Sequence, residues 1–432
     1  MTAAVESQSD AFATAGTCRG CGQPALERMF SLGDVPGVNA FLEADHLDQE
    51  RPYPLDVAWC RECTLVQLES IVPPEELFSH YQHLSSASQS NAQHLASLAD
   101  TLIERLNLHA SSKIMEIGSN DGTLLTEFKR VTSHLLGVDP AENLAQYARQ
   151  KGVDVISAFF NAAVADRVIA ERGRQDLVLA LNVVAHTPDV NALLAAVGRV
   201  LAPGGTFVME AVHVHRTILH GEFDTIYHEH VYCFSLTALA PLLERAGLTI
   251  VDVQQLPTQG GSLRVFAKHA DEQPALADSV EQLFTAESNE GVRDPDTYEQ
   301  VGKRVGQFKD ELLTKLDALK NKHGCIYGLG APARGVVILN YCGIGPDDLD
   351  AVVDDTPLKQ GRMVPGVHIP VVDWQAVADQ QPGGYLLLSW NYQREIVAKL
   401  RKHVESAEIL IPFPEICTVT VSPEQPNVAP KP

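Results

Sequence analysis

The sequence predicts an α/β fold with a central Rossmann-like parallel sheet, a small N-terminal module and a second, C-terminal Rossmann-like α/β domain. Short apolar runs alternate with amphipathic segments between residues 113 and 210, as in a doubly wound sheet. Two Cys-x-x-Cys pairs precede this region. A second strand, glycine turn and helix start follow at 325–335.

Composition restricts the possible partners. The chain has 432 residues, 33 basic and 55 acidic, for a formal net charge of −22. Such a charge repels phosphate backbones, so we expect no nucleic-acid partner. Residues 1–16 lack the apolar core of a signal peptide, and no later segment is apolar for about 20 residues, so we expect no membrane partner and a cytoplasmic location. We expect a monomer or a weak homodimer.

The first element is a small module at residues 1–72 that ends at Pro73-Pro74. Its cysteines are spaced as zinc ligands: Cys18, Cys21, Cys60 and Cys63. Two such pairs complete a tetrahedral site without an open position, which predicts structural Zn²⁺. The alternative is a set of reduced thiols without metal. The segments between the pairs suggest short strands and loops, in which metal substitutes for a small core.

The central domain is expected at residues 73–272. Apolar residues at helical spacing over 75–110 predict helix, and the expected parallel strands are 113–118, 134–139, 153–157, 176–181 and 206–210. The run Leu201–Gly205 is expected to end a helix before the fifth strand. After a helix at 236–247, Leu248–Leu256 and Ser262–Lys268 predict a hairpin at the sheet edge.

The C-terminal domain is expected at residues 273–422. Charged helices at 275–322 precede the strand and glycine turn Cys325–Gly335, which suits either a phosphate group or a tight turn. A strand at Leu349–Val353 ends in Asp354-Asp355. The proline-rich tail, 423–432, is expected to be disordered.

The glycine turn after the first central strand predicts a nucleoside site. A dinucleotide site usually has three glycines in G-x-G-x-x-G spacing and no acids beside the pyrophosphate. Here acids flank the turn, which favours a cationic ligand such as S-adenosylmethionine. Asp139 follows about 20 residues later, where a carboxylate can accept both ribose hydroxyls. The predicted cofactor residues are Glu116, Gly118, Asn120, Asp121, Gly122, Asp139, Phe160 and Asn182. The alternative is a strand end with ordinary surface acids.

Candidate catalytic residues lie between the fifth strand and the next helix. Tyr227, His228, Glu229 and His230 occupy a loop expected at the carboxyl end of the sheet, where such folds place their sites. Histidine suits proton removal because its pKa lies near neutral pH. One alternative is a metal site, in which His228 and His230 would share a face of an extended segment. Another is a structural loop rich in histidine.

The motifs together resemble the sugar C-methyltransferases, which act on nucleotide-linked 4-keto-deoxysugars. The resemblance runs from Cys18 to about Glu415 and rests on five motifs: the paired Cys-x-x-Cys knuckles, Glu116–Gly122, Tyr227–His230, Gly260–Arg264 and Gly328–Gly335. It implies a class I methyltransferase sheet, S-adenosylmethionine as cofactor and a nucleotide-sugar substrate. It also implies that the C-terminal segment Asp354–Gly361 helps to hold that substrate.

The resemblance implies roles for individual residues. His230 would remove the proton at the carbon to be methylated, with Tyr227 and Glu229 in the same pocket. His186 matches an active-site histidine, and Tyr81 matches a segment that closes over the sugar. This chain has His83 where family members often carry a second tyrosine.

The expected reaction is removal of a proton next to a ketone, followed by in-line methyl transfer to the enolate carbon. Tyr81, His186 and Tyr227 are candidates to stabilise the enolate oxygen. One alternative is an O- or N-methyltransferase acting on another small metabolite, which needs no ketone. The other is a non-catalytic adaptor, which would be expected to have lost Asp139 and the 227–230 cluster.

Overall fold

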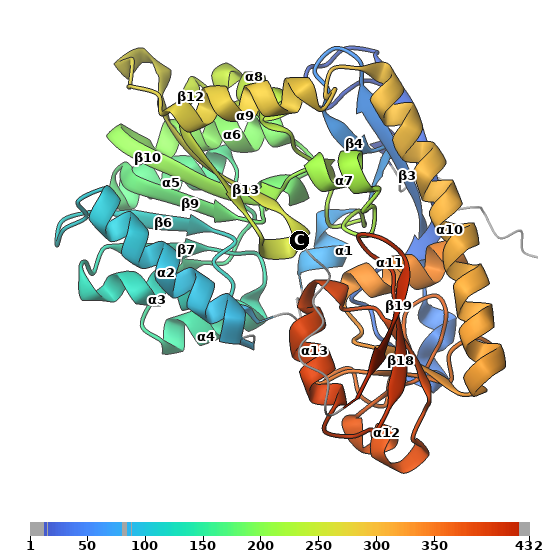
Figure 1. The fold of residues 1–432 in the computed structure, drawn as a ribbon. Coiled ribbons are helices and arrows are strands. Elements are labelled where there is room, and N and C mark those ends of the chain that lie inside the picture. The colour runs from blue at the N-terminus through green and yellow to red at the C-terminus, as the bar shows by residue number, and fades with distance from the viewer. Residues whose placement is uncertain (1–12, 15, 80–83, 88, 423–432) are drawn as a thin grey trace, which may run out of the picture.

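The computed structural model describes residues 13–14, 16–79, 84–87 and 89–422, whose strands form four sheets. Figure 1 shows the central sheet on one side, the C-terminal sheet below it on the other, and the long helix α10 (Pro295–His323) along the outer edge. The predicted α/β fold is confirmed. Tyr81, His83 and the tail 423–432 lie outside the described residues.

The central sheet has seven strands in the order β12-β13-β10-β9-β6-β7-β8. The five expected parallel strands are present and pair in parallel from β10 to β8. The antiparallel hairpin of β12 and β13 is confirmed, with β12 at the edge. The bounds are β6 Ile114–Ile117, β7 Leu135–Val138, β8 Asp154–Ile156, β9 Gln175–Leu181, β10 Leu201–Val212, β12 Leu248–Leu256 and β13 Ser262–His269.

Helices cover both faces of this sheet, as expected for a doubly wound fold. One face packs on α2 and α3, and the other packs on α5, α6 and α8. These helices and α4 span α2 Gln89–Arg105, α3 Thr123–Glu127, α4 Glu142–Gln150, α5 Ala162–Arg172, α6 Val190–Val200 and α8 Leu236–Arg245.

One strand boundary differs from the prediction. The run Leu201–Gly205 was expected to separate helix from strand, but β10 already begins at Leu201. Its pairing with β9 shifts register between Leu201 and Thr206. The irregularity accommodates Pro203, which cannot donate a ladder hydrogen bond. Sequence breakers thus mark a bulge inside the strand.

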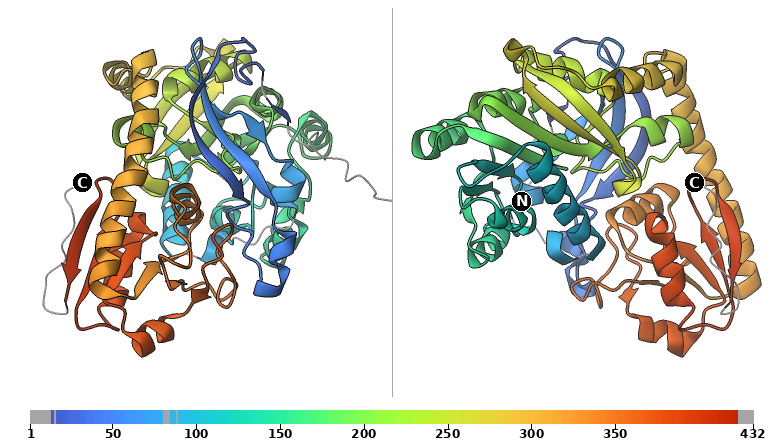
Figure 2. Two further views of the ribbon diagram at one scale, coloured as in Figure 1. Left: turned by 90° about the vertical axis from the view of Figure 1, so that its right-hand side faces the viewer. Right: turned by 60° about the vertical axis from the view of Figure 1, so that its left-hand side comes forward.

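The N-terminal module does not form a separate core. Its strands β2 (Leu26–Pro36), β3 (Pro52–Cys60) and β4 (Val66–Leu68) continue into β11 (Tyr232–Cys233), which comes from the central part of the chain. Trp59 of β3 stacks on Tyr298 of α10, with ring centres 4.1 Å apart. Figures 1 and 2 show α10 beside the blue strands of this module.

Metal is therefore not the only substitute for a separate core in this module. Apolar side chains of β2 and β3 are buried in one cluster with those of α10 and the C-terminal sheet. The boundaries at 72 and 272 stay predictions. Across them, β11 pairs with β4, and α10 packs on β3. The remaining short elements here are β1 Ala13–Thr14, β5 Ser70–Ile71, α1 Pro74–Phe78 and α7 His215–His220.

The C-terminal sheet has six strands in the order β16-β15-β14-β17-β18-β19, parallel except for β19. The expected charged helices are α9 (Asp278–Asn289) and α10. The other elements are β14 Ile326–Leu329, α11 Ala333–Cys342, β15 Ala351–Val353, β16 Val371–Val372, α12 Trp374–Gln380, β17 Gly384–Leu387, α13 Gln393–Leu400, β18 Ala407–Ile411 and β19 Cys417–Val421.

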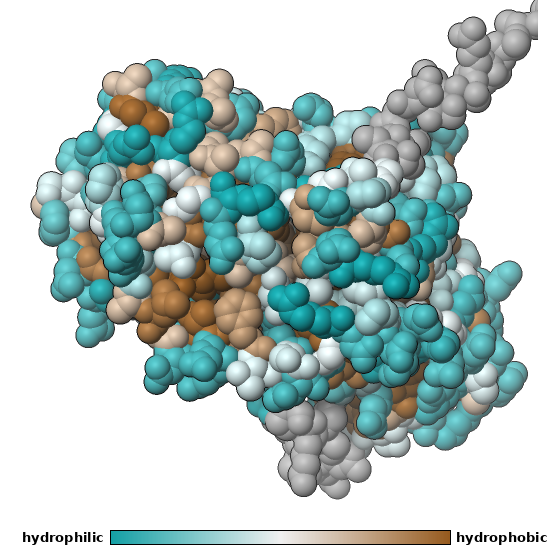
Figure 3. Space-filling model, turned by 90° about the horizontal axis from the view of Figure 1, so that it is seen from above, coloured by the Kyte–Doolittle hydropathy of each residue, from teal (hydrophilic) through white to brown (hydrophobic). Residues whose placement is uncertain are grey.

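The surface is mainly polar on the face seen from above in Figure 3, where hydrophobic side chains gather in a patch on the left. Within the described residues, no helix combines the length and the apolar character needed to cross a bilayer.

Candidate active site

A cavity of about 950 Å³ lies where the three parts of the chain meet. Its wall includes Asn39 of the N-terminal module, the carboxyl ends of the central strands, and Arg334 and Lys359 of the C-terminal part. Ten of the predicted site residues line it: Glu116, Gly118, Asn120, Asp139, Phe160, Asn182, His186, Tyr227, Glu229 and His230. The structure thus brings together residues that the sequence places up to 114 positions apart, from Glu116 to His230.

The glycine turn approaches the cavity closely. Gly118 has a φ of 70°, and a Cβ there would lie 2.3 Å from Cγ2 of Val183. A side chain at this position is therefore excluded both by the left-handed backbone and by contact. The next turn residue, Asn120, has a φ of 50°, and its backbone N–H donates to Asp139 at 2.8 Å. The turn is thereby fixed to the predicted ribose anchor.

Asp121 and Gly122 do not line the cavity, and their expected role toward the cofactor stays a prediction. The Asp121 carboxylate accepts hydrogen bonds from the Thr123 hydroxyl at 2.7 Å and from Lys151 at 3.1 Å. Gly122 has a φ of 73° and faces Ala148, whose Cβ would lie 2.8 Å from an added Cβ. Both residues build the turn, because spacing along the chain does not determine which way each side chain of a turn points.

The two remaining acids have different environments. Asp139 accepts backbone hydrogen bonds from Asn120 and Ala141, at 2.8 and 2.9 Å. Glu116 is buried, and its Oε2 has no hydrogen-bond partner among the described residues. Burial and the nearby carboxylates of Asp139 and Asp121 raise the pKa of Glu116 well above its usual value. A ligand that brings hydroxyls or positive charge fits these acids, so the residues present suit S-adenosylmethionine.

His230 is held in one tautomer. Its Nδ1 lies 2.6 Å from the Thr225 carbonyl oxygen, which can only accept, so Nδ1 carries the proton and Nε2 keeps a free lone pair. Burial lowers the pKa of His230 to about 4, so the ring is neutral at pH 7. The ring lies 4.0 Å from the Tyr227 ring and 5.1 Å from the His186 ring.

His186 and Tyr227 flank this base. His186 stacks on Phe78 at 5.4 Å, and within the part of the chain that the structure describes its buried Nε2 has no hydrogen-bond partner. Burial, with a smaller contribution from His230, lowers the pKa of His186 well below its usual value. Burial and the charge of Glu229 raise the pKa of Tyr227, which therefore keeps its hydroxyl proton. Both side chains can present polar groups to a substrate in the cavity.

His228 does not line the cavity, unlike the other three residues of its motif. Its Nε2 lies 3.2 Å from the Tyr53 carbonyl oxygen, and the two rings meet edge to face. The segment forms turns and is not extended, so the expected alternation of side chains does not apply. Among the described residues, clusters suited to a metal comprise the four cysteines and an exposed set at 43–46. The alternative of a metal at 228–230 therefore finds no support.

The four cysteines fit a zinc ion. Sγ atoms lie 3.6 Å apart both between Cys18 and Cys63 and between Cys21 and Cys60. All four lie within 4.8 Å of one another. A tetrahedral site with Zn–S bonds of about 2.3 Å spaces its sulfurs by about 3.8 Å. The donor set and its closed geometry therefore suit a structural Zn²⁺.

Several cavity residues were not predicted from the sequence. Asn39 donates from its amide to Glu229 at 2.6 Å. Arg334 and Lys359 supply positive charge from the C-terminal part. The glycine turn at 328–335 was a signal for this wall, and Asp354 fixes it by accepting from the backbone N–H of Ala331 at 2.7 Å. The positions of these residues along the chain gave no indication that they lie beside the loop at 227–230.

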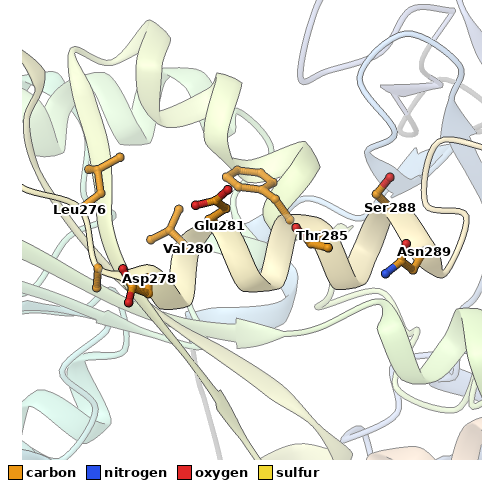
Figure 4. Close-up of a pocket in the computed structure, with 9 residues that line it drawn as sticks. Leu276, Asp278, Val280, Glu281, Thr285, Ser288 and Asn289 are labelled. Carbon is orange, nitrogen blue, oxygen red and sulfur yellow. The ribbon is translucent and has the colours of Figure 1, made fainter.

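A second hollow, of about 510 Å³, lies along α9. Figure 4 shows its labelled side chains along the helix, with Leu276 just before it. The lining includes the carboxylates of Asp278 and Glu281 but no histidine, cysteine, lysine or arginine. Among the described residues, this hollow therefore lacks the histidines and cations that line the larger cavity.

Comparison with known proteins identifies the family. The chain is 34% identical over 400 residues to the C-methyltransferase NovU of Streptomyces niveus, covering 92% of this chain and 95% of that protein. This chain belongs to the C-methyltransferases. Three family models match it in order: a putative zinc binding domain at 18–78, a methyltransferase domain at 89–253 and a C-methyltransferase C-terminal domain at 257–414.

More distant matches cover smaller parts of this C-methyltransferase. A ubiquinone biosynthesis O-methyltransferase of Bradyrhizobium sp. (strain ORS 278) is 32% identical over 109 residues, 25% of this chain and 43% of that protein. The solved structure of magnesium protoporphyrin IX methyltransferase from Synechocystis PCC 6803 with bound SAM has a TM-score of 0.31 and 16% identity. That match covers 41% of this chain and 78% of that chain.

The family and the geometry agree on the cofactors. The protein is an S-adenosylmethionine-dependent methyltransferase with a zinc-binding N-terminal region. The alternative of a non-catalytic adaptor is therefore wrong, as the retained Asp139 and histidine loop already indicated.

Proposed function

We propose that this C-methyltransferase methylates the carbon next to the ketone of a nucleotide-linked 4-keto-deoxysugar, with His230 as the base. The observation that carries the proposal is the fixed tautomer of His230, whose unprotonated Nε2 belongs to a side chain that lines the cavity. A carbon acid next to a ketone needs one such base, because the charge left behind moves onto oxygen.

The low pKa of His230 suits this role in two ways. At neutral pH the ring is unprotonated, so its lone pair is always available. Once it takes the substrate proton, the imidazolium lies beside a negative enolate, and this opposite charge stabilises the protonated form. The low pKa belongs to the empty pocket and rises as charge develops in the substrate.

Donors near the ketone oxygen support the same reaction. The Tyr227 hydroxyl and the His186 ring line the cavity around His230, so they are placed to stabilise an enolate oxygen. Tyr81 stays a predicted third donor. S-adenosylmethionine, when bound beside Glu116 and Asp139, supplies an electrophilic methyl group. Holding the enolate carbon against that group removes much of the entropic cost of bringing two molecules together.

The nucleotide part of the substrate is supported by cavity size and charge. A volume of about 950 Å³ is near the upper end of the ~300–1,000 Å³ range of small-molecule sites, which suits two ligands. Lys359 lines the C-terminal wall of a protein whose net charge is −22, and its ammonium donates to the Ala331 carbonyl oxygen. Arg334 and Lys399 line the same wall but pair with Asp224 and Asp355, so Lys359 is the cation of the three that suits an anionic diphosphate linkage.

The test combines a substrate panel with isotope exchange. The zinc-replete protein is incubated with S-adenosylmethionine and a series of 4-keto nucleotide sugars, and products are analysed for a new carbon–methyl bond. In parallel, His230→Asn is assayed for exchange of the substrate α-hydrogen with solvent. We expect C-methylated product from the wild type and loss of exchange in the variant. Exchange at the wild-type rate in His230→Asn would rule out this base, and a methyl group on oxygen or nitrogen would support the alternative reaction.

A further inference from the structure

We propose that Asp224, Arg334 and Trp390 form a positioning triad that orients His230 from the C-terminal part of the chain. The inference rests on the proposed function in that His230 is taken as the base. It adds that this base reaches its working tautomer through residues that come from the loop before β11 and from the C-terminal part of the chain.

The triad is a buried and fully engaged cluster. Asp224 is 0% exposed and accepts two hydrogen bonds from Arg334, from Nη2 at 2.7 Å and from Nε at 3.0 Å. The indole Nε1 of Trp390 donates to the same carboxylate at 2.7 Å. The Arg334 guanidinium also lies over the Trp390 ring, 4.3 Å from its centre. Three hydrogen bonds thus fix the carboxylate, and the contact between Arg334 and Trp390 holds its two donors together.

The residue that carries the fixed carboxylate directly precedes the residue whose carbonyl oxygen contacts the His230 ring. Asp224 immediately precedes Thr225, whose carbonyl oxygen lies 2.6 Å from Nδ1 of His230. A peptide carbonyl can reorient only if the backbone on either side rotates. Anchoring Asp224 therefore restricts the Thr225 carbonyl, and that carbonyl determines which ring nitrogen of His230 carries the proton.

The surrounding backbone is shaped to admit Arg334. A Cβ on Gly260 would lie 2.4 Å from Nη1 of Arg334, and Gly260 has a φ of 84°. Gly260 begins the Gly260–Arg264 motif, to which the proposed reaction assigns no role. The structure gives this glycine a purpose, which is close packing against a guanidinium that two hydrogen bonds hold in place.

Stability alone explains this arrangement poorly. Burying an arginine and a carboxylate costs desolvation energy that often equals or exceeds their attraction, so apolar residues of similar volume would serve a purely structural contact as well. Such a cluster provides a defined orientation. The loop that contains Asp224 also contains His230. A fixed orientation of Asp224 therefore constrains the base that the proposed reaction needs.

The experiment compares three triad variants with a matched control. Asp224→Asn keeps the shape of the side chain but removes its charge. Trp390→Phe removes one donor and leaves the ion pair. Arg334→Lys keeps the charge but loses the two-point contact. The control is Arg105→Lys: Arg105 pairs with Asp252 at 2.6 Å and stacks over Phe266 at 4.0 Å, away from the cavity lining.

Three readouts separate positioning from folding. Histidine-selective nitrogen NMR, with the His230 signals assigned by their loss in His230→Asn, reports the tautomer without any substrate. Calorimetry with S-adenosylmethionine checks that the cofactor site is intact. Turnover on the substrate found in the panel gives kcat and KM. We expect Asp224→Asn to mix the two tautomers and to lower kcat by about 10- to 100-fold, as small misplacements of a reacting group do.

Trp390→Phe and the control are expected to change kcat less than Asp224→Asn does. Trp390→Phe is expected to give a smaller loss of kcat with cofactor binding unchanged, and it provides the test if Asp224→Asn does not fold. Arg105→Lys is expected to leave tautomer and kcat unchanged. A pure Nδ1–H tautomer with wild-type kcat in folded Asp224→Asn or Trp390→Phe would overturn the inference. Because the NMR needs no substrate, this failure is distinguishable from failure of the panel, which would reject the proposed function.

Discussion

The amide of Asn39 donates a hydrogen bond to the carboxylate of Glu229, with 2.6 Å between Nδ2 and Oε1. Asn39 follows the long strand β2 of the N-terminal module, whereas Glu229 directly precedes the proposed base. The zinc-binding region thus supplies a side chain to the wall of the active site. The zinc-binding region therefore contributes to this wall as well as to the stability of the fold.

Asn39→Asp tests this contact. The substitution replaces a donor by a second carboxylate against Glu229, which leaves Glu229 without this hydrogen bond and adds repulsion. The expected cost of about 1–3 kcal/mol corresponds to roughly a 10- to 100-fold loss in kcat/KM. Steady-state kinetics with zinc content measured in the same sample provide the check. Asn289→Asp, on the exposed side of α9, is the control and should retain full activity. Equal activity of the two variants would refute the role of Asn39.

Asp139→Ala should weaken S-adenosylmethionine binding. The variant loses the acceptor proposed for the ribose hydroxyls and also releases the backbone N–H groups of Asn120 and Ala141. Hydrogen bonds to a charged group are worth about 1.5–3 kcal/mol, so we expect the Kd to rise by roughly 10- to 100-fold. Isothermal calorimetry measures it. Asp154→Ala removes an exposed carboxylate paired with Arg172, and an unchanged Kd is expected there.

Acid should destabilise the protein partly through His230. Its pKa is about 4 when folded and ~6.5 when unfolded, so below pH 6.5 the unfolded chain binds a proton that the folded chain does not. Stability is therefore lost as pH falls from about 6.5 toward 4. Between pH 7 and 4.5 the contribution of this group is about 2 to 3 kcal/mol. Urea unfolding at both pH values should give a smaller loss for His230→Asn, and identical losses would contradict the assignment.

Removal of zinc should unfold more than the N-terminal module. Cys60→Ser eliminates one thiolate ligand, and we expect loss of bound metal and a decrease of about 3 kcal/mol or more in the free energy of unfolding. Because Trp59 is adjacent to Cys60 and stacks on Tyr298, tryptophan fluorescence should report loosening of α10 as well. Cys417→Ser, on β19 outside the cluster, should retain its zinc. A metal-free Cys60→Ser protein of unchanged stability would argue against a structural role.

Local signals in the sequence predicted much of the fold. Alternating apolar runs predicted the central strands, the glycine turn at Gly118 predicted the end of the first, and the cysteine pairs predicted the zinc cluster. These features depend on neighbours within a few residues, so a single sequence carries them. The direction of individual side chains was less accessible: Asp121 looked like a cofactor residue but accepts hydrogen bonds from Thr123 and Lys151.

Long-range assembly was not predictable in this way. The strand β11 has two residues, and its pairing with β4 exists because the two segments meet in the folded chain. The same holds for Asn39 beside Glu229 and for Arg334 beside Asp224, which are 190 and 110 positions apart. No periodicity records such contacts. The residues of the site that sequence reasoning missed are those brought in by other parts of the chain.

The pairing of β11 with β4 bears on how such enzymes can be recombined. Tyr232 lies two positions after His230, so the strand that completes the N-terminal sheet is continuous with the loop that carries the proposed base. A chimaera that takes its first segment from a relative must therefore match the host at this strand, or the graft will disturb the loop. The N-terminal segment is not an interchangeable part.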